Sequence, residues 1–127
     1  MRILLVEPGK APVSKEIDGS LKSMQGVVGG TIQALYPFEE PVALVCNDEG
    51  KLLRLPLNRA LRDAEGHIYD IVAGTFFLCG APEGSDRFES LPRQTEEIYQ
   101  KYFQCTENFV RVLGELLCVS IDSQDQL

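Results

Sequence analysis

The chain has 127 residues and a formal net charge of −7; 44% of its residues are hydrophobic and 24% are charged. These are ordinary values for a globular protein. The length fits one domain whose hydrophobic core is large enough to be stable without disulfides or a bound metal. No apolar run reaches the ~18 residues of a membrane span, and the surplus of acid disfavours binding to nucleic acid, whose phosphates require a positive surface.

The chain opens with the apolar run RILLVE at residues 2–7, bounded by Pro8 and Gly9, which predicts a buried strand. Residues 13–18, VSKEID, alternate in polarity and predict an antiparallel partner for this first strand. The stretch MRILLVEPG is too short for a signal peptide, so we expect the protein to stay in the cytoplasm.

A helix is predicted over residues 20–29, because Leu21, Met24 and Val28 recur on one face at helical spacing. Asp18 or Ser20 is its expected N-cap, and the following Gly29 and Gly30 are expected to end it. The VGG sequence does not indicate a phosphate loop, since it closes a helix and lacks the Lys and Ser/Thr of such loops.

Residues 31–36 alternate and predict a strand that ends near Pro37, and VALVC at 42–46 predicts a central strand. NDEG at 47–50 is typical of a turn, so we expect KLLRL at 51–55 to pair back as a hairpin strand. Pro56 suits the first turn of a short helix, PLNRALRD, over residues 56–63.

Residues 67–80, HIYDIVAGTFFLCG, predict one long strand, in which Gly74 indicates a bulge or the close approach of another backbone. A loop follows at 81–90, and the apolar spacing of LPRQTEEIYQKYFQ predicts a helix over residues 93–104. For residues 107–121 we favour a β-hairpin with a turn at LGE over a helix. The polar end, residues 122–127, is expected to fray.

These elements predict a single α+β domain over residues 1–127, in which a mostly antiparallel sheet packs with two main helices, at about 20–29 and 93–104. Four cysteines, at positions 46, 79, 105 and 118, lack C-x-x-C spacing and have mostly apolar flanks. We interpret them as buried small hydrophobic residues, and with one histidine, His67, the sequence gives no indication of a metal site or a cofactor.

Three segments in order, VGGTIQALYP, ALVCNDEGKLLRLPLNRAL and IVAGTFFLCG, follow an N-terminal LLVEPGKAPVSKEIDGSL. The chain therefore resembles, over about residues 2–81, the bacterial and phage family described as domain of unknown function 3846. The resemblance implies a setting in phages and mobile elements and no agreed activity. The positions that match the family pattern are Gly29, Gly30, Asp48, Gly50, Lys51, Pro56 and Asn58.

The function that we favour is a non-enzymatic protein-binding domain. Basic and amide side chains that share a strand edge and a short helix form a candidate binding cluster for a carboxylate, a phosphate or an acidic partner segment. Its members are Lys51, Arg54, Asn58, Arg59 and Arg62. Lys51 and Asn58 are of particular interest, because the requirements of a turn or of backbone conformation do not explain why these residue types match the family pattern.

The charge is uneven along the chain: residues 1–63 carry 8 acids and 8 bases, whereas residues 64–127 carry 11 acids and 4 bases. The acidic half predicts a surface that opposes the basic cluster of a second copy, giving a homodimer. Its candidate residues are Glu83, Asp86, Glu89, Glu96 and Glu97, with Glu107 beyond them. An alternative is an acidic decoy that imitates nucleic acid and blunts a host defence system.

A small hydrolase is the other alternative. Cys46 ends a strand beside Asn47 and Asp48, and His67 is the one available imidazole. A cysteine nucleophile needs an activated thiolate with a base in hydrogen-bond reach, which this pattern does not indicate. Neighbouring acids such as Asp48 and Glu49 point in different directions along a chain, so we assign no catalytic residue.

Overall fold

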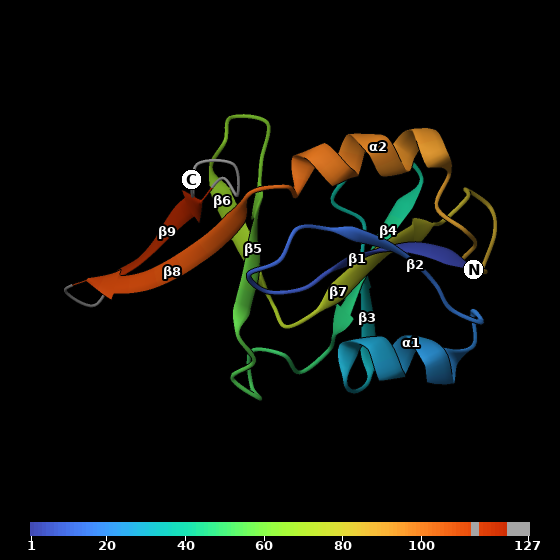
Figure 1. Ribbon diagram of the computed structural model, residues 1–127, viewed down its shortest axis with the longest axis horizontal. Coiled ribbons are helices and arrows are strands. Elements are labelled where there is room, and N and C mark those ends of the chain that lie inside the picture. Colours follow the sequence, from blue (N-terminus) through green and yellow to red (C-terminus); the bar gives the residue numbers. More distant parts are fainter. Residues whose placement is uncertain (113–114, 122–127) are drawn as a thin grey trace.

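The computed structural model describes residues 1–112 and 115–121. Its elements, in chain order, are β1 (Arg2–Val6), β2 (Val13–Glu16), α1 (Leu21–Val28), β3 (Ile32–Leu35), β4 (Val42–Asn47), β5 (Leu57–Arg62), β6 (Ile68–Ala73), β7 (Phe76–Gly80), α2 (Arg93–Tyr102), β8 (Thr106–Val112) and β9 (Glu115–Ile121). Five strands form an antiparallel sheet in the order β2-β1-β7-β4-β3, while β5 pairs with β6 and β8 pairs with β9 (Figure 1). The predicted α+β class is confirmed.

The two helices cover opposite faces of the five-stranded sheet (Figure 1). In β4, Val42 and Leu44 pack in the cluster that contains Tyr99 of α2, whereas Ala43 and Val45 pack in the cluster that contains Met24 of α1. Side chains alternate between the faces of a strand, so a strand covered on both sides must be apolar at every position. This explains the unbroken apolar run that predicted a central strand.

The predicted helix over residues 20–29 is confirmed as α1. The Ser20 hydroxyl accepts a hydrogen bond from the Ser23 amide at 3.0 Å and thus caps the first turn. Gly29 ends the helix in the left-handed conformation, with φ +78°, which glycine adopts without a Cβ clash.

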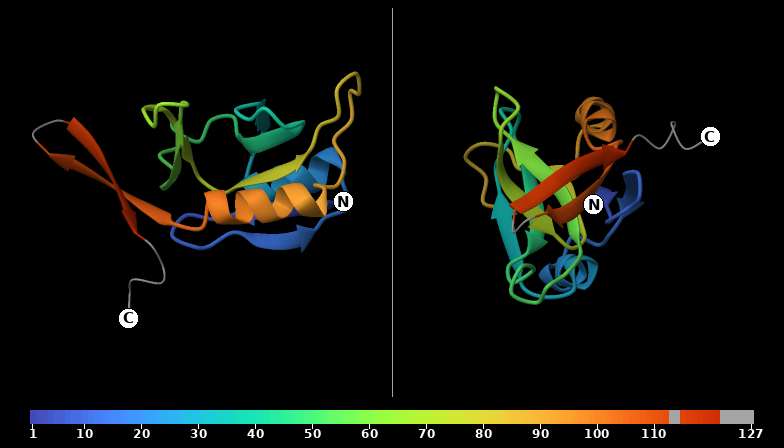
Figure 2. Two further views of the ribbon diagram at one scale, coloured as in Figure 1. Left: turned by 90° about the horizontal axis from the view of Figure 1, so that it is seen from above. Right: turned by 90° about the vertical axis from the view of Figure 1, so that its left-hand side faces the viewer.

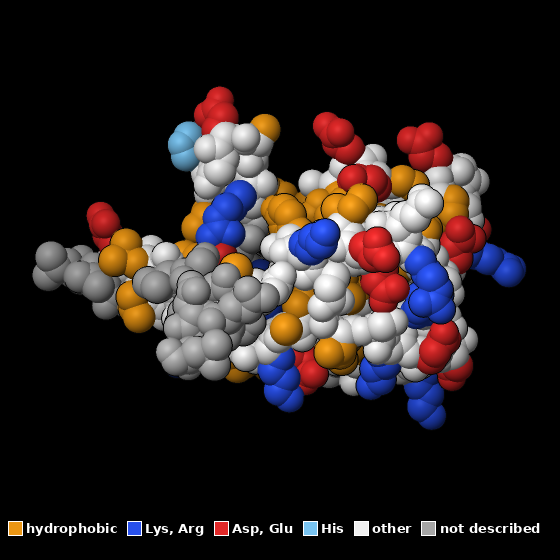
Figure 3. Space-filling model, turned by 45° about the horizontal axis from the view of Figure 1, so that its top comes forward, with side chains coloured by type: hydrophobic (Ala, Val, Ile, Leu, Met, Phe, Trp, Pro, Cys, Tyr) orange, Lys and Arg blue, Asp and Glu red, His pale blue; other side chains and the backbone are white. Residues whose placement is uncertain are grey.

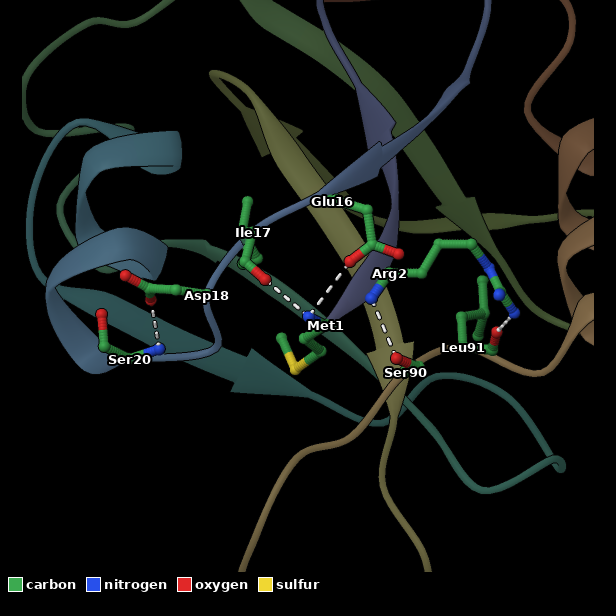
Figure 4. Close-up of polar contacts among 8 residues, drawn as sticks. All are labelled: Met1, Arg2, Glu16, Ile17, Asp18, Ser20, Ser90 and Leu91. Carbon is green, nitrogen blue, oxygen red and sulfur yellow. Dashed lines mark hydrogen bonds and ion pairs between the residues drawn. The ribbon is translucent and has the colours of Figure 1, made fainter.

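The start of β1 is tied to segments on both sides (Figure 4). The Met1 amino group donates to the Ile17 carbonyl at 2.5 Å, which continues the predicted β1–β2 pairing. The Arg2 amide donates to Ser90 Oγ at 2.9 Å, and its guanidinium donates to the Leu91 carbonyl. Strand β1 thereby holds the segment that leads into α2.

The predictions for residues 51–63 are wrong. Residues 51–54 form turns in which the Leu53 amide donates to the Glu49 carbonyl at 2.8 Å, and Arg54 has a positive φ of 56°. Residues 57–62, predicted as part of a helix, form β5, which pairs with β6. At residues 51–55 the turn that begins at NDEG continues through local backbone bonds to residues 49–51, whereas residues 57–62 become a strand because they pair with β6.

The predicted single strand over 67–80 is two strands, β6 and β7, which belong to different sheets. The chain turns at Gly74, where φ is +84° and the amide donates to the Pro56 carbonyl at 2.7 Å. The Pro56 backbone thus makes the close approach expected at Gly74, and a Cβ here would also lie 2.7 Å from the Leu55 side chain at Cδ1.

The predicted helix over 93–104 is confirmed as α2, and the hairpin favoured for 107–121 is confirmed as β8 and β9. The turn predicted at residues 113–114 and the fraying predicted at 122–127 lie outside the described residues. Of the helices in the described part of the chain, neither is long and apolar enough to cross a membrane.

Candidate functional site

The predicted basic cluster does not form one surface, because its members have different surroundings. Lys51 and Arg54 are exposed in the turns after β4, and Lys51 Nζ lies 2.6 Å from Asp70 Oδ1. This ion pair borders a small hollow of about 130 Å³ between residues 46–52 and 70–73. An exposed pair of this kind contributes little to stability, so Lys51 is available for exchange with another partner.

Asn58 and Arg59 lie inside the protein. A β-bulge between Leu57 and Arg59 interrupts the alternation of β5, so both side chains point inward. Asn58 Nδ2 donates to the carbonyls of Val6 and Gly74, both at 2.9 Å, and is fully buried. The amide therefore joins β5 to β1 and to the bend between β6 and β7, which gives Asn58 a structural role.

Arg59 is 2% exposed, and its guanidinium donates to oxygen atoms of the protein itself. It donates to the carbonyls of Phe103 at 2.9 Å and Lys10 at 2.7 Å, and to Asn58 Oδ1 at 2.8 Å. Burial lowers the pKa of Arg59 from its ordinary value, because a low-dielectric interior disfavours the charged form. Arg59 fastens the end of α2 to β5 and cannot meet a ligand from outside.

The residues of the predicted acidic surface differ in their exposure. Glu83, Asp86, Glu89 and Glu97 are exposed, whereas Glu96 is half-buried and lies 3.6 Å from Arg2 Nε. Figure 3 shows acidic side chains spread over the body of the protein with basic side chains between them. This mixed surface differs from the unbroken row of negative charge that imitates a nucleic acid.

Two of the four free cysteines are buried, as predicted, but Cys105 is exposed and Cys118 is half-buried. Burial raises the pKa of Cys46 to about 11 and of Cys79 to about 12, so neither thiol ionises near neutral pH. His67, the imidazole of the hydrolase alternative, lies in the exposed β5–β6 turn beside Asp63 and Glu65. These surroundings do not activate Cys46 as a nucleophile.

Strands β8 and β9 form a hairpin that projects from the rest of the protein; we call this hairpin the arm and residues 1–104 the body (Figures 1 and 2). The arm is fixed to the body at its base. Glu107 of β8 is buried, and its carboxylate lies 2.6 Å from Arg62 Nη2 and accepts a hydrogen bond from the Ala60 amide at 2.5 Å. Arg62 also lies 3.4 Å from Cys118 Sγ of β9.

An apolar pair stands exposed on the arm. Val110 lies directly opposite Leu117 in the register of β8 and β9, and each is 45% exposed. Glu107 lies on the face of the arm that packs on the body. Because side chains alternate along a strand, Val110 and Leu117 both lie on the opposite face. Leu116, 40% exposed, lies on the Glu107 face. The arm thus has apolar side chains on both faces, and the body covers one face near its base.

Sequence reasoning missed Val110 and Leu117 as candidate site residues. Their apolar character was a reason to predict strands, and a strand pattern does not tell whether a second layer covers it. The available signal was that apolar residues follow one another without alternation in ELLCVSI, so that a two-stranded hairpin has to present some of them to solvent.

A family model described as "Domain of unknown function (DUF3846)" matches residues 1–104. This range contains the five-stranded sheet, both helices and the β5–β6 hairpin, and it ends before β8. The arm therefore lies outside the matched range. No curated protein and no solved structure matches the chain.

Proposed function

We propose that this chain, which belongs to the family described as a domain of unknown function (DUF3846), is a non-enzymatic binding domain that engages a partner protein through the arm. The exposed Val110–Leu117 pair carries this proposal. Solvent-facing apolar side chains on an element that stands clear of the body favour association with another apolar surface, because contact removes them from water.

The attachment of the arm supports this role. An isolated two-stranded hairpin is marginally stable in water, but here Glu107, Arg62 and the Ala60 amide hold its base. A fixed base places the apolar pair away from the body in a defined orientation. A preoriented surface loses less conformational freedom when it binds, which favours affinity.

The partner that fits this surface is a protein with an apolar patch and a strand edge. In the described part of the chain β8 and β9 form a sheet of two strands, and the edge of such a sheet can pair with a strand of a partner. A second copy of this chain satisfies both requirements, so a homodimer through the arm is one form of this proposal; it uses a different surface from the charge-paired homodimer that the sequence predicted. The setting that the family resemblance implies, a bacterial phage or mobile element, belongs to the proposal as well.

We also propose a cytoplasmic location, which the four free cysteines support, because oxidising compartments favour disulfides. The acidic decoy receives less support than the binding domain. Arg87, Arg93 and Lys101 interrupt the acidic residues of the range 83–107. Two carboxylates of this range, Glu96 of α2 and Glu107 of β8, are engaged by arginines of the body.

Affinity capture from a host lysate tests the arm. The full chain is compared with Val110→Thr/Leu117→Thr, which keeps strand-forming residues and reduces apolar surface. The matched control is Val13→Thr/Leu52→Thr, which alters two exposed apolar residues of the body. We expect at least a tenfold loss of a co-purified protein for the arm variant and no loss for the control.

Sedimentation of the same three proteins at low and high salt separates a second copy from a different partner. A dimer that persists at high salt and dissociates in the arm variant identifies self-association through apolar contact. Equal capture by all three proteins, together with a monomer throughout, would contradict the proposed function.

A further inference from the structure

A second surface of the body forms a hollow of about 820 Å³. Its walls are the β3–β4 connection, residues 36–41, and the loop after β7, residues 81–88. The Ala81 amide donates to the Pro41 carbonyl at 2.8 Å and joins the two walls at their base. This loop lies at the end of the body away from the arm (Figures 1 and 2).

Three aromatic side chains face this hollow. Tyr36 is 64% exposed, and Phe38 and Phe88 are half-buried. The Phe38 ring lies 4.3 Å from the Tyr99 ring of α2, and Phe88 packs against the cluster beneath α1. Because core contacts hold Phe38 in one wall and Phe88 in the other, the hollow has preformed apolar surface on both sides, and the exposed Tyr36 ring adds a third aromatic face.

The charge around the rings selects the class of occupant. Glu39, Glu40, Glu83 and Asp86 line the hollow with one cation, Arg87. Tyr99 donates its hydroxyl hydrogen bond to Glu40 at 2.6 Å, and this bond lowers the pKa of Glu40, so that the carboxylate stays charged. Aromatic faces and carboxylates together attract cations, through the ring quadrupole and through ion pairing.

We infer that this hollow binds a basic peptide segment and receives a Lys or Arg side chain between the aromatic rings and the carboxylates. The aliphatic stem of either side chain packs on the rings while its charged head meets the rim. The volume lies within the range of sites that enclose a small ligand, which suits one or two side chains with their backbone. The partner is thus a protein with an exposed basic segment, and this contact is independent of the arm.

The probe for this site is an acetylated and amidated pentapeptide, Gly-Lys-Arg-Lys-Gly, with Gly-Glu-Asp-Glu-Gly as its acidic counterpart. Titration into the ¹⁵N-labelled full chain is followed by amide NMR. We expect saturable shifts centred on residues 36–41 and 81–88 with the basic peptide and no shifts with the acidic one. Shifts spread over all acidic residues, or no binding, would overturn the inference.

Two variants distinguish specific binding of the basic peptide in the hollow from nonspecific attraction of the peptide to an acidic protein. Tyr36→Ala/Glu39→Gln removes an aromatic face and a charge from the hollow, and Tyr69→Ala/Glu65→Gln makes the same changes at exposed positions of the β5–β6 hairpin. We expect the first variant to bind the peptide at least tenfold more weakly and the second to bind within twofold of the native chain. Equal weakening by both variants would overturn the inference.

A further variant, Glu83→Gln/Asp86→Asn, leaves the aromatic wall untouched and keeps the inference testable if the Tyr36 variant does not fold. We expect it to weaken binding severalfold and to reduce the salt dependence of the affinity. Unchanged affinity in this variant would overturn the inference.

Discussion

Arg62 and Glu107 join β5 to the base of the arm through an ion pair whose Nη2–Oε1 distance is 2.6 Å. Glu107 is buried, and Arg62 is about one third exposed. We expect Glu107→Gln, which removes the charge and keeps the shape, to lower the free energy of unfolding by about 1–2 kcal/mol, since solvent weakens the pair. Urea unfolding measures this loss.

The exposed Glu115 of β9 supplies the control, Glu115→Gln. Hydrogen exchange should quicken in β8 and β9 for the Glu107 variant and stay unchanged for the control. If both variants match the native chain in unfolding and exchange, this ion pair does not hold the arm.

Asn58 should behave as a structural residue. Asn58→Ala leaves the carbonyls of Val6 and Gly74 without their donor inside the protein. We expect a loss of about 2–4 kcal/mol in the free energy of unfolding, because each unsatisfied buried polar group costs about 1–3 kcal/mol. Denaturant unfolding compares this variant with Asn108→Ala, at an exposed position of β8, for which no more than about 0.5 kcal/mol is expected. Equal effects would contradict the assignment.

The carboxyl group of Asp18 should titrate at unusually low pH. Hydrogen bonds from the hydroxyl and then the amide of Ser20 lower its pKa from 3.8 to about 2. Its pKa is lower in the folded state, so its stabilising effect is present above about pH 4 and is lost as the pH falls towards 2. NMR titration of the carboxyl carbon should give a midpoint near 2, and Ser20→Ala should raise it. A midpoint at 3.8 or above in the native chain would contradict this relationship.

The four thiols should react at different rates with a disulfide reagent at pH 8. Cys105 is exposed and should react quickly, whereas Cys46 and Cys79 should react after unfolding, because burial hides them and raises their pKa. Cys118 is half-buried, with its pKa raised by burial, and should be intermediate. Cys105→Ser should remove the fast phase. If the fast phase instead disappears in Cys46→Ser, then Cys46 is the reactive thiol, which would contradict its assignment as a buried, unreactive residue and support the cysteine hydrolase alternative.

Sequence patterns predicted the elements whose signals are local. The apolar runs of β1 and β4, the glycine that ends α1 and the helical spacing of α2 each depend on neighbours in the chain. The same patterns failed at residues 51–63, where local turn bonds replace the predicted hairpin strand and pairing with the distant β6 replaces the predicted helix. Gly50 lies against the Ala73 carbonyl, and Asn58 bonds to Val6 across the sheet.

The candidate site was harder to predict than the fold, because burial depends on packing between layers. Arg59 was predicted to lie in a short helix and to take part in a binding cluster, but it lies in β5, where a bulge turns its side chain into the interior. Lys51 and Asp70 meet although 19 residues separate them. Tyr36 and Asp86 line one hollow because the sheet order places β7 beside β4, a neighbour relationship that composition and periodicity do not contain.

Site-specific photocrosslinking tests the binding role of the arm most directly. A benzoylphenylalanine at position 117 is compared with one at position 52, which is exposed in a turn of the body. We expect irradiation in host cells to join a distinct protein, or a second copy of the chain, to position 117 and not to position 52. Absence of any crosslinked product at position 117, or the same products from both positions, would contradict the account.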